Sequence, residues 1–227
     1  MSGISKTQVD LLGDRLRKGE VSDEDLRRLD SHRGSFAEAY HEVIAAVRAA
    51  TQLEPTGRPA KSTTSIVEKL RRETIRLSQM QDIAGCRLVV EDIALQDRVV
   101  EELRGGFARV TVVDRRKQPS YGYRAVHLIP IFRNRAVEIQ VRTELQHLWA
   151  QLSERLSDAV DPAIKYGGGD ARTQSMLFNI SNAIEALETW ELRGAGAGGA
   201  RDVAERKQQL GGLLKGLIAL LVEARKR

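Results

Sequence analysis

The chain has 227 residues, enough to bury a hydrophobic core, and this length suits one compact domain with helical additions. Its content of 41% apolar and 30% charged residues is ordinary for a soluble globular protein, and no apolar run approaches the roughly 20 residues of a membrane span. A net charge of +5 and a pI near 9.5 favour anionic ligands such as nucleotides, RNA or acidic lipid. The single cysteine, Cys86, excludes an internal disulfide, and the first residues lack the apolar region of a secretion signal. We therefore expect a cytoplasmic protein without a membrane partner.

The first 52 residues are predicted to form a helical extension. Apolar residues at helical spacing predict helices over 6–17, from Ser22 and from about Ser35. The Ser-x-x-Asp and Ser-x-x-Glu spacings that begin at Ser22 and Ser35 are signals of capped helix starts. These helices are expected to act as scaffold.

The next segment combines cations with a predicted helix start. A loop that carries Arg58 and Lys61 leads into a hydroxyl-rich helix that includes Ser65, and Lys69 lies one turn further along the same face. Free N–H groups at a helix start and nearby cations both favour an anion, so this segment is a candidate phosphate site. The alternative is a solvated basic surface.

A mixed sheet is predicted for the middle of the chain. Asp82 precedes a strand that ends near Val90, a helix covers 92–103, and further strands cover 107–113, 123–131 and 137–142. This order of strands and helices predicts a mixed sheet with helices packed on it, an α+β or α/β architecture, and we take α+β as the fold class. Asp82 itself is a candidate cap or metal ligand.

A basic turn is predicted between the second and third of these strands. Three consecutive cations precede a pair of tyrosines around Gly122, which suits a site that holds a phosphate while a ring stacks on a base. The alternative is a β-turn with a basic tip. Tyr123 and His127 are predicted to share one face of the following strand. The candidate residues of this turn are Arg115, Arg116, Lys117, Tyr121, Tyr123 and His127.

The strand over 137–142 alternates strictly between apolar and polar residues. The apolar side chains of Val137, Ile139 and Val141 are expected to pack on the core, and the opposite face is expected to present Glu138, Gln140 and Arg142. Thr143 and Gln146 have the spacing of a capping box, which predicts a helix over 144–158.

The last part of the chain is predicted to be helical. A helix over 173–192 and a final helix with a leucine stripe are separated by a Gly/Ala linker at 194–200. The stripe either packs back on the domain or joins another subunit, and we expect a homo-oligomer. The predicted division is 1–52 for the N-terminal helices, 53–169 for the central domain and 170–227 for the C-terminal helices.

Four motifs in this order resemble the RelA/SpoT synthetase domain of the alarmone pyrophosphokinases, from about Gly57 to Gly168. The motifs are Lys61-x-x-x-Ser65-Ile-x-x-Lys69, Asp82-Ile-Ala-Gly-x-Arg87, Gly122-Tyr123-x-x-x-His127, and Glu138-Ile-Gln-x-Arg-Thr143 followed by Trp149-Ala.

The resemblance implies a nucleotidyltransferase-like mixed sheet that moves pyrophosphate from ATP to the 3′-hydroxyl of GDP or GTP and releases AMP. It implies Mg²⁺ held by Asp82 and Glu138, with Glu138 also accepting the hydroxyl proton. The implied catalytic residues are Glu138, Asp82, Arg87 and His127. The implied ATP-binding residues are Arg58, Lys61, Ser65, Lys69 and Arg87. The implied acceptor-binding residues are Tyr123, Arg115, Arg116, Lys117, Tyr121, His127, Gln140 and Arg142.

The sequence departs from the family pattern at Ser120 and Tyr121, where relatives usually have Asn before the Gly-Tyr pair and Lys after the Pro, in a segment one residue longer. This departure leaves the acceptor open. One alternative is a toxin-type relative that modifies the tRNA 3′-CCA end or makes adenine alarmones and has an antitoxin partner. Another is a catalytically silent nucleotide- or RNA-binding domain. The histidines include no His-Asp pair, so no hydrolase half is expected.

Overall fold

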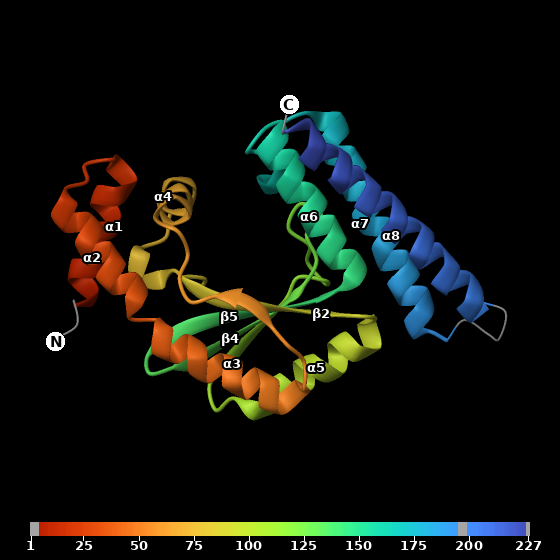
Figure 1. Cartoon of the computed structure of the whole chain (residues 1–227), viewed down its shortest axis with the longest axis horizontal. Helices are drawn as coiled ribbons and strands as arrows, with labels where there is room; N and C mark the ends of the chain where they lie inside the picture. The colour runs from red at the N-terminus through yellow and green to blue at the C-terminus, as the bar shows by residue number, and fades with distance from the viewer. Residues whose placement is uncertain (1–4, 195–198, 226–227) are drawn as a thin grey trace. The chain divides into compact units, whose positions relative to one another are not determined.

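The computed structural model describes residues 5–194 and 199–225 (Figure 1). The predicted Gly/Ala linker at 194–200 therefore lies partly outside the described residues. The chain forms two compact units and passes between them several times. Unit 1 comprises Met1–Leu88, Glu102–Val112 and Leu128–Gln140, and unit 2 comprises Val89–Glu101, Val113–His127 and Val141–Arg227.

Five strands form one sheet in the order β1-β2-β5-β4-β3, and most of it belongs to unit 1. The short edge strand β1 pairs antiparallel with β2, and a tight turn at Arg133 and Asn134 joins β4 to β5. Both turn residues have positive φ, which matches the twist that a two-residue hairpin needs. The strands are β1 (Thr56–Arg58), β2 (Ala84–Val90), β3 (Val110–Asp114), β4 (Val126–Phe132) and β5 (Arg135–Thr143).

The helices of unit 1 follow the capping signals of the sequence with one exception. Ser22 accepts a hydrogen bond from the Asp25 main-chain N–H and caps α2, as predicted. The predicted capping box at Ser35 is wrong, because the Ser35 hydroxyl donates to the His32 carbonyl and α3 begins at Ala37 without a side-chain cap. These elements are α1 (Lys6–Lys18), α2 (Asp23–Gly34), α3 (Ala37–Thr51), α4 (Thr63–Arg72) and the short 3-10 helix η1 (Leu77–Gln79); α5 (Ile93–Gly106) runs through both units.

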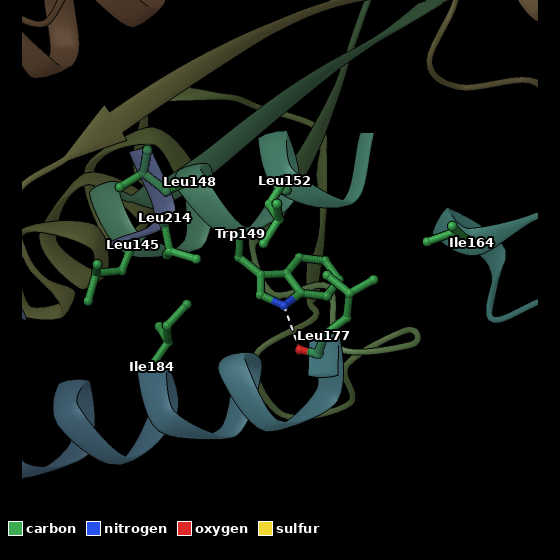
Figure 2. Packing of buried hydrophobic residues seen from close by; sticks show 9 residues of the cluster. Leu145, Leu148, Trp149, Leu152, Ile164, Leu177, Ile184 and Leu214 are labelled. Carbon is green, nitrogen blue, oxygen red and sulfur yellow. Dashed lines mark hydrogen bonds between the residues drawn. The ribbon is translucent and has the colours of Figure 1, made fainter. Parts of the chain in front are cut away.

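Unit 2 is built around a helical cluster that packs on Trp149 (Figure 2). The indole of Trp149 donates a hydrogen bond of 2.7 Å to the Leu177 carbonyl, so the ring is fixed by packing and by its polar atom. Leu214 of the last helix is fully buried in the same cluster. The helices lie side by side in Figure 1 and are α6 (Glu144–Ala159), α7 (Ala171–Leu192) and α8 (Gly199–Ala224), with the 3-10 turn η2 (Ile164–Tyr166).

Only part of the leucine stripe of α8 packs back on unit 2. Leu214 is buried, whereas Leu213 and Leu217 of the stripe are 67% and 41% exposed, and Leu220, outside the predicted stripe, is 68% exposed. None of the helices in the described ranges combines the length and the apolar character that crossing a bilayer demands.

Candidate functional site

Two lysines hold Asp82 at the entrance of β2 in unit 1. The Lys61 Nζ lies 2.7 Å from Asp82 Oδ2, and the Lys69 Nζ lies 2.8 Å from Asp82 Oδ1. Burial would raise the pKa of Asp82, but the two ammonium groups outweigh it and lower the pKa to about 2. The structure thus brings together three of the predicted site residues and keeps the carboxylate ionised.

Lys61 is fixed by its main chain as well as by its side chain. Its N–H donates to the Ile83 carbonyl at 2.6 Å, and its carbonyl accepts from the Arg33 guanidinium at 2.7 Å. Ser62 then caps α4 by accepting from the Ser65 N–H, and the two hydroxyls are 2.9 Å apart. Burial lowers the pKa of Lys61 despite the attraction of Asp82. Two cations that share one carboxylate leave this place with a net positive charge, which a phosphate would neutralise.

Glu138 lies on β5, next to a glycine of β2. A Cβ placed on Gly85 would lie 2.8 Å from the Glu138 carbonyl oxygen and 3.4 Å from its Cβ, so only glycine fits there without displacing β5. The Gln140 side-chain amide donates a 2.7 Å hydrogen bond to Glu138 Oε2, because residues two apart on a strand share a face. Glu138 and Gln140 therefore lie on the same face of β5, as the alternation predicts.

Arg58 of β1 lies across β2 from Glu138, at the level of Gly85. Its register partner in β2 is Gly85, and paired residues of neighbouring strands point to the same face. Gly85 lets the main chain of β5 at Glu138 come close to β2, because even a Cβ at this position would collide with it. Arg87, two residues beyond Gly85, shares this face of β2. The short strand β1 was not predicted, although it is what positions Arg58.

Tyr123, His127 and Arg142 form a second group, in unit 2. The Tyr123 hydroxyl is 2.9 Å from His127 Nε2 and also accepts a 2.9 Å hydrogen bond from Arg142 Nη2. The Tyr123 and His127 rings meet edge to face with centroids 5.7 Å apart, and the guanidinium of the buried Arg142 lies 4.9 Å from the Tyr123 ring centre. Three predicted acceptor residues are thus brought together around one aromatic ring.

Tyr123 does not lie in a strand, contrary to prediction. β4 begins at Val126, and Tyr123 instead forms an isolated bridge with Ser120 because positive φ angles at Tyr121 and Gly122 turn the chain. A Cβ on Gly122 would come within 2.8 Å of the Trp149 ring, so the turn needs glycine both for its φ and for its packing.

The turn is held from α7, outside all four motifs. The Ser181 hydroxyl donates to the Gly122 carbonyl at 2.6 Å and accepts from Arg124 Nε at 3.0 Å. The buried Arg124 also donates to Glu185 at 2.7 Å. Sequence reasoning missed these residues, since no local pattern links positions so far apart in the chain.

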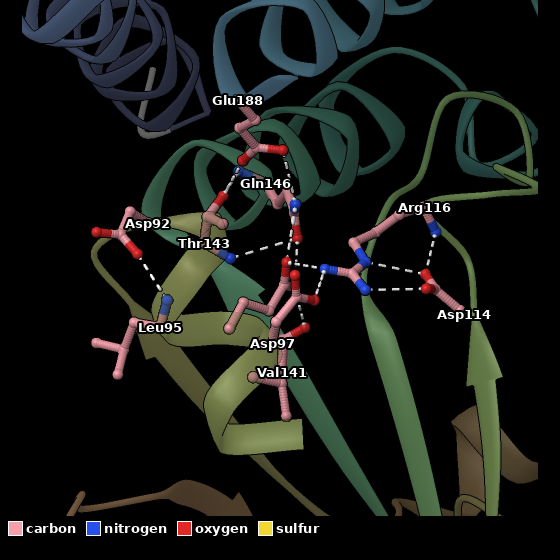
Figure 3. Close-up of polar contacts among 10 residues, drawn as sticks. Asp92, Leu95, Asp97, Asp114, Arg116, Val141, Thr143, Gln146 and Glu188 are labelled. Carbon is pink, nitrogen blue, oxygen red and sulfur yellow. Dashed lines mark hydrogen bonds and ion pairs between the residues drawn. The ribbon is translucent and has the colours of Figure 1, made fainter. Parts of the chain in front are cut away.

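Arg116 is bound within a polar network of unit 2 (Figure 3). Its guanidinium makes two hydrogen bonds to Asp114, of 2.9 and 3.0 Å, and one of 2.7 Å to Asp97. These carboxylates raise the pKa of Arg116 although burial opposes them. Its neighbour Arg115 donates to the Ser120 hydroxyl, and Lys117 is exposed. Of the three consecutive cations, Arg116 makes two ion pairs within the fold, whereas Arg115 makes a hydrogen bond to a hydroxyl.

A buried acid of α7 completes this network and was missed by the sequence analysis. Glu188 is 3% exposed and accepts hydrogen bonds from the Thr143 hydroxyl and the Gln146 amide, the pair that caps α6 as predicted (Figure 3). Burial raises the pKa of Glu188 against the opposing effect of these donors. The sequence does show an acid one turn beyond Ile184, on the apolar face of α7, but it does not show the partners of that acid.

Comparisons with known proteins place this geometry in a family. The family model described as the region found in RelA/SpoT proteins matches residues 57–157. An uncharacterized protein of Mycobacterium tuberculosis is 38% identical over 136 residues, which cover 58% of this chain and 48% of that protein. The chain thus spans about half the length of the mycobacterial relatives it matches. The GTP pyrophosphokinase YjbM of Bacillus subtilis is 34% identical over 160 residues, which cover 61% of this chain and 71% of YjbM.

Solved structures give the same result for the fold. The crystal structure of the small alarmone synthetase 1 from Bacillus subtilis bound to its product pppGpp matches with a TM-score of 0.60 and 27% identity, over 75% of this chain and 99% of that one. A second structure of that synthetase, bound to AMPCPP, matches with a TM-score of 0.51 and 26% identity, over 74% and 97% of the two chains. The chain therefore belongs to the RelA/SpoT family and has the mixed α+β fold of the small alarmone synthetases.

Proposed function

We propose that the protein is an ATP-dependent pyrophosphokinase that transfers the β,γ-pyrophosphate of ATP to the 3′-hydroxyl of GDP or GTP and releases AMP. The observation that carries this proposal is the pairing of Asp82 with Lys61 and Lys69, with Glu138 and Gln140 on the adjoining face of the sheet. Phosphoryl-type transfer needs fixed cations around the migrating phosphates and a base for the attacking hydroxyl, and both kinds of group are present. We retain the predicted cytoplasmic location as part of the proposal.

The ATP phosphates are assigned to the cations of unit 1. Lys61 and Lys69 would exchange part of their contact with Asp82 for phosphate oxygens, and Arg58 and Arg87 would contact the same ligand from β1 and β2. Ser65, whose N–H belongs to the first turn of α4, would add a hydroxyl. These contacts neutralise the charge that accumulates on the pyrophosphate as the bond to AMP breaks.

Glu138 is the proposed base. The acceptor 3′-oxygen forms a bond to the β-phosphorus, the bond from that phosphorus to the oxygen bridging to the α-phosphate breaks, and AMP leaves with that oxygen. Glu138 accepts the hydroxyl proton, and the hydrogen bond from Gln140 holds its carboxylate in place.

The carboxylates suit a magnesium site whose coordination is completed by the phosphates of the bound substrate. No cluster of three or more metal-ligating acids, histidines or cysteines occurs among residues 5–194 and 199–225. Mg²⁺ is commonly held by one or two carboxylates together with substrate phosphates and water, so Asp82 and Glu138 are a sufficient protein contribution. When bound, the ion would neutralise phosphate charge, which is why we propose it as the cofactor.

The acceptor nucleotide is assigned to the group around Tyr123 in unit 2. The ring is a platform for a base, and Arg142 and His127 hold its hydroxyl. Tyr121, Arg115 and Lys117 come from the same turn and are the proposed contacts to the rest of the acceptor.

Labelled ATP tests the proposal directly. The purified protein is incubated with Mg²⁺ and γ-labelled ATP, and GDP, GTP, AMP, ADP, ATP and bulk tRNA are offered separately. Label in a guanosine product, together with release of AMP, is the expected result. No transfer to any acceptor, with ATP still bound, would instead indicate a silent nucleotide-binding domain.

One observation favours the toxin-type alternative as a second candidate. Tyr121, which stands where relatives usually have Asn, is 62% exposed, and its ring packs against Gly167. An exposed aromatic ring beside the acceptor group suits a base of a polynucleotide as well as a free nucleotide. Label in tRNA or in an adenosine product would support this alternative and the search for an antitoxin partner.

Replacing Tyr123 by alanine is expected to raise the acceptor KM about tenfold to a hundredfold, because stacking of a base on an aromatic ring contributes roughly 1–3 kcal/mol. The KM for ATP is expected to stay unchanged. Tyr123→Phe is the matched control: it keeps the ring and loses the contacts of the hydroxyl with His127 and Arg142, so its effect should be smaller. Steady-state kinetics with each substrate varied measures both, and an unchanged acceptor KM in Tyr123→Ala would remove the stacking role.

The exposed side of α8 is the proposed contact with a second copy of the chain. Leu213, Leu217 and Leu220 surround Gly212 and Gly216 in a shallow groove, so two such faces can place the leucines of one copy over the glycines of the other. Leu217→Lys is expected to reduce the molar mass measured by light scattering to half or less, because a charge would be buried at the contact. Lys215→Glu, at an exposed position of α8 outside the groove lining, is the control; equal masses for wild type and Leu217→Lys would contradict the proposal.

A further inference from the structure

A cavity of about 560 Å³ lies in unit 1, away from the predicted site residues. It is bounded by α1, by the end of α2 and the residues after it, by the segment around η1, and by the hairpin between β4 and β5. None of the candidate catalytic, ATP-binding or acceptor-binding residues lines it. Its function is therefore not explained by the pyrophosphokinase proposal.

Two buried polar atoms of the lining have no hydrogen-bond partner in the described part of the chain. These atoms are the His32 Nε2 and the Ser78 Oγ, and His32 is only 5% exposed. Buried polar side-chain atoms are nearly always hydrogen-bonded, because an unpaired one costs about 1–3 kcal/mol. Burial lowers the pKa of His32 to about 4, so its ring is neutral at pH 7 and offers one donor and one acceptor. A ligand that forms hydrogen bonds in this cavity would satisfy both atoms.

The charged residues of the lining are both cations. Lys6 and Arg135 line the cavity, and no acidic residue from 5–194 or 199–225 lines it. The Arg135 guanidinium lies 5.0 Å from the centre of the Phe36 ring, and His32 meets the same ring edge to face at 5.4 Å. Arg135, Phe36 and His32 therefore form a continuous wall that is partly flat and aromatic. Cations without a carboxylate select an anion, and an aromatic wall favours a planar group.

We propose that this cavity binds a small organic anion that carries a planar ring. Its anionic group would lie between Lys6 and Arg135, its ring would lie along Phe36, and its polar atoms would hydrogen-bond to His32 and Ser78. The proposal goes beyond pyrophosphate transfer and does not depend on it, because the lining residues and the predicted site residues do not overlap.

Phenyl phosphate is a suitable probe. Inorganic phosphate, which keeps only the anionic group, and benzyl alcohol, which keeps only the ring, are the comparison molecules. Binding to the full chain is measured by calorimetry or by NMR titration. We expect phenyl phosphate to bind about tenfold more tightly than either comparison molecule, and Arg135→Gln to weaken its binding about tenfold through the loss of one charge-assisted contact. Ser78→Ala leaves all charges in place and is expected to weaken the binding severalfold.

Arg133→Gln is the matched control, since Arg133 lies on the same hairpin, is exposed, pairs with Glu38 and does not line the cavity. It should bind phenyl phosphate like the wild type. A second control, Lys69→Gln, removes a cation of the proposed ATP site and should also leave the binding unchanged. The proposal is overturned if phenyl phosphate does not bind, if benzyl alcohol binds equally well, or if Lys69→Gln weakens the binding and Arg135→Gln does not.

Discussion

Glu138→Gln is expected to reduce pyrophosphate transfer by about a thousandfold or more while the protein stays folded. Loss of a general base alone typically costs between a hundredfold and ten thousandfold, and the same change removes one of the two proposed carboxylate ligands of Mg²⁺. The fold should survive because glutamine has nearly the same shape and its amide oxygen can still accept the hydrogen bond from Gln140. The measurement is the rate of AMP release at saturating ATP and acceptor.

The control for this variant is Glu144→Gln. Glu144 is an exposed acid six residues further along the chain and belongs to none of the proposed groups. Both variants should unfold at the temperature of the wild type, and only Glu138→Gln should lose activity. Turnover within a few-fold of wild type in Glu138→Gln would refute the assignment of the base.

Asp82→Asn is expected to lower both activity and stability. The pKa of Asp82 falls from 3.8 to about 2 on folding, and its side chain is only 19% exposed. Each unit of pKa shift corresponds to about 1.4 kcal/mol, so the ionised carboxylate contributes about 2 kcal/mol of stability at pH 7. The burial of Lys61 opposes this contribution, and removing the carboxylate would leave that buried ammonium group without its partner. Transfer should fall at least a hundredfold.

The contribution of Asp82 to stability is expected to fall as the pH is lowered. Because folding lowers the pKa of Asp82, the stabilisation is fully present above about pH 4 and is lost as the pH falls towards 2. The difference in unfolding free energy between wild type and Asp82→Asn should therefore shrink over that range in urea titrations. Asp14→Asn, which breaks an exposed pair with Arg17, should cost less than about 0.5 kcal/mol at any pH. A constant difference for Asp82→Asn would show that its pairing with the lysines does not depend on charge.

Local patterns predicted the parts of the fold that local forces determine. The alternation over 137–142 is confirmed by the complete burial of Val137, Ile139 and Val141, and the capping box of Thr143 is present. These features could be predicted because the alternation of apolar residues and the capping of a helix depend only on residues within one strand or one helical turn. The helix start at Ser35 was predicted wrongly, because the Ser35 hydroxyl donates to the His32 carbonyl and does not cap α3.

Features that depend on distant residues were not readable from the sequence. The three consecutive cations looked equivalent, but the structure binds Arg116 to Asp97 of α5 and leaves Lys117 exposed. Likewise, the role of Glu188 appears only when α7 packs on the start of α6. Such pairings are set by tertiary packing, which overrides the local meaning of a residue.

Because Arg33 donates a hydrogen bond to the Lys61 carbonyl, the segment that the family model matches is not the smallest part of the chain that would hold the proposed site in place. The family match covers 57–157 and contains all the proposed site residues, but Arg33 precedes it and holds Lys61, and Ser181 follows it and holds the Gly122 turn. An isolated fragment of 57–157 would keep the chemistry and lose what orients it. Any effort to graft the proposed activity onto another scaffold should therefore include α2 and α7 as well as the motifs.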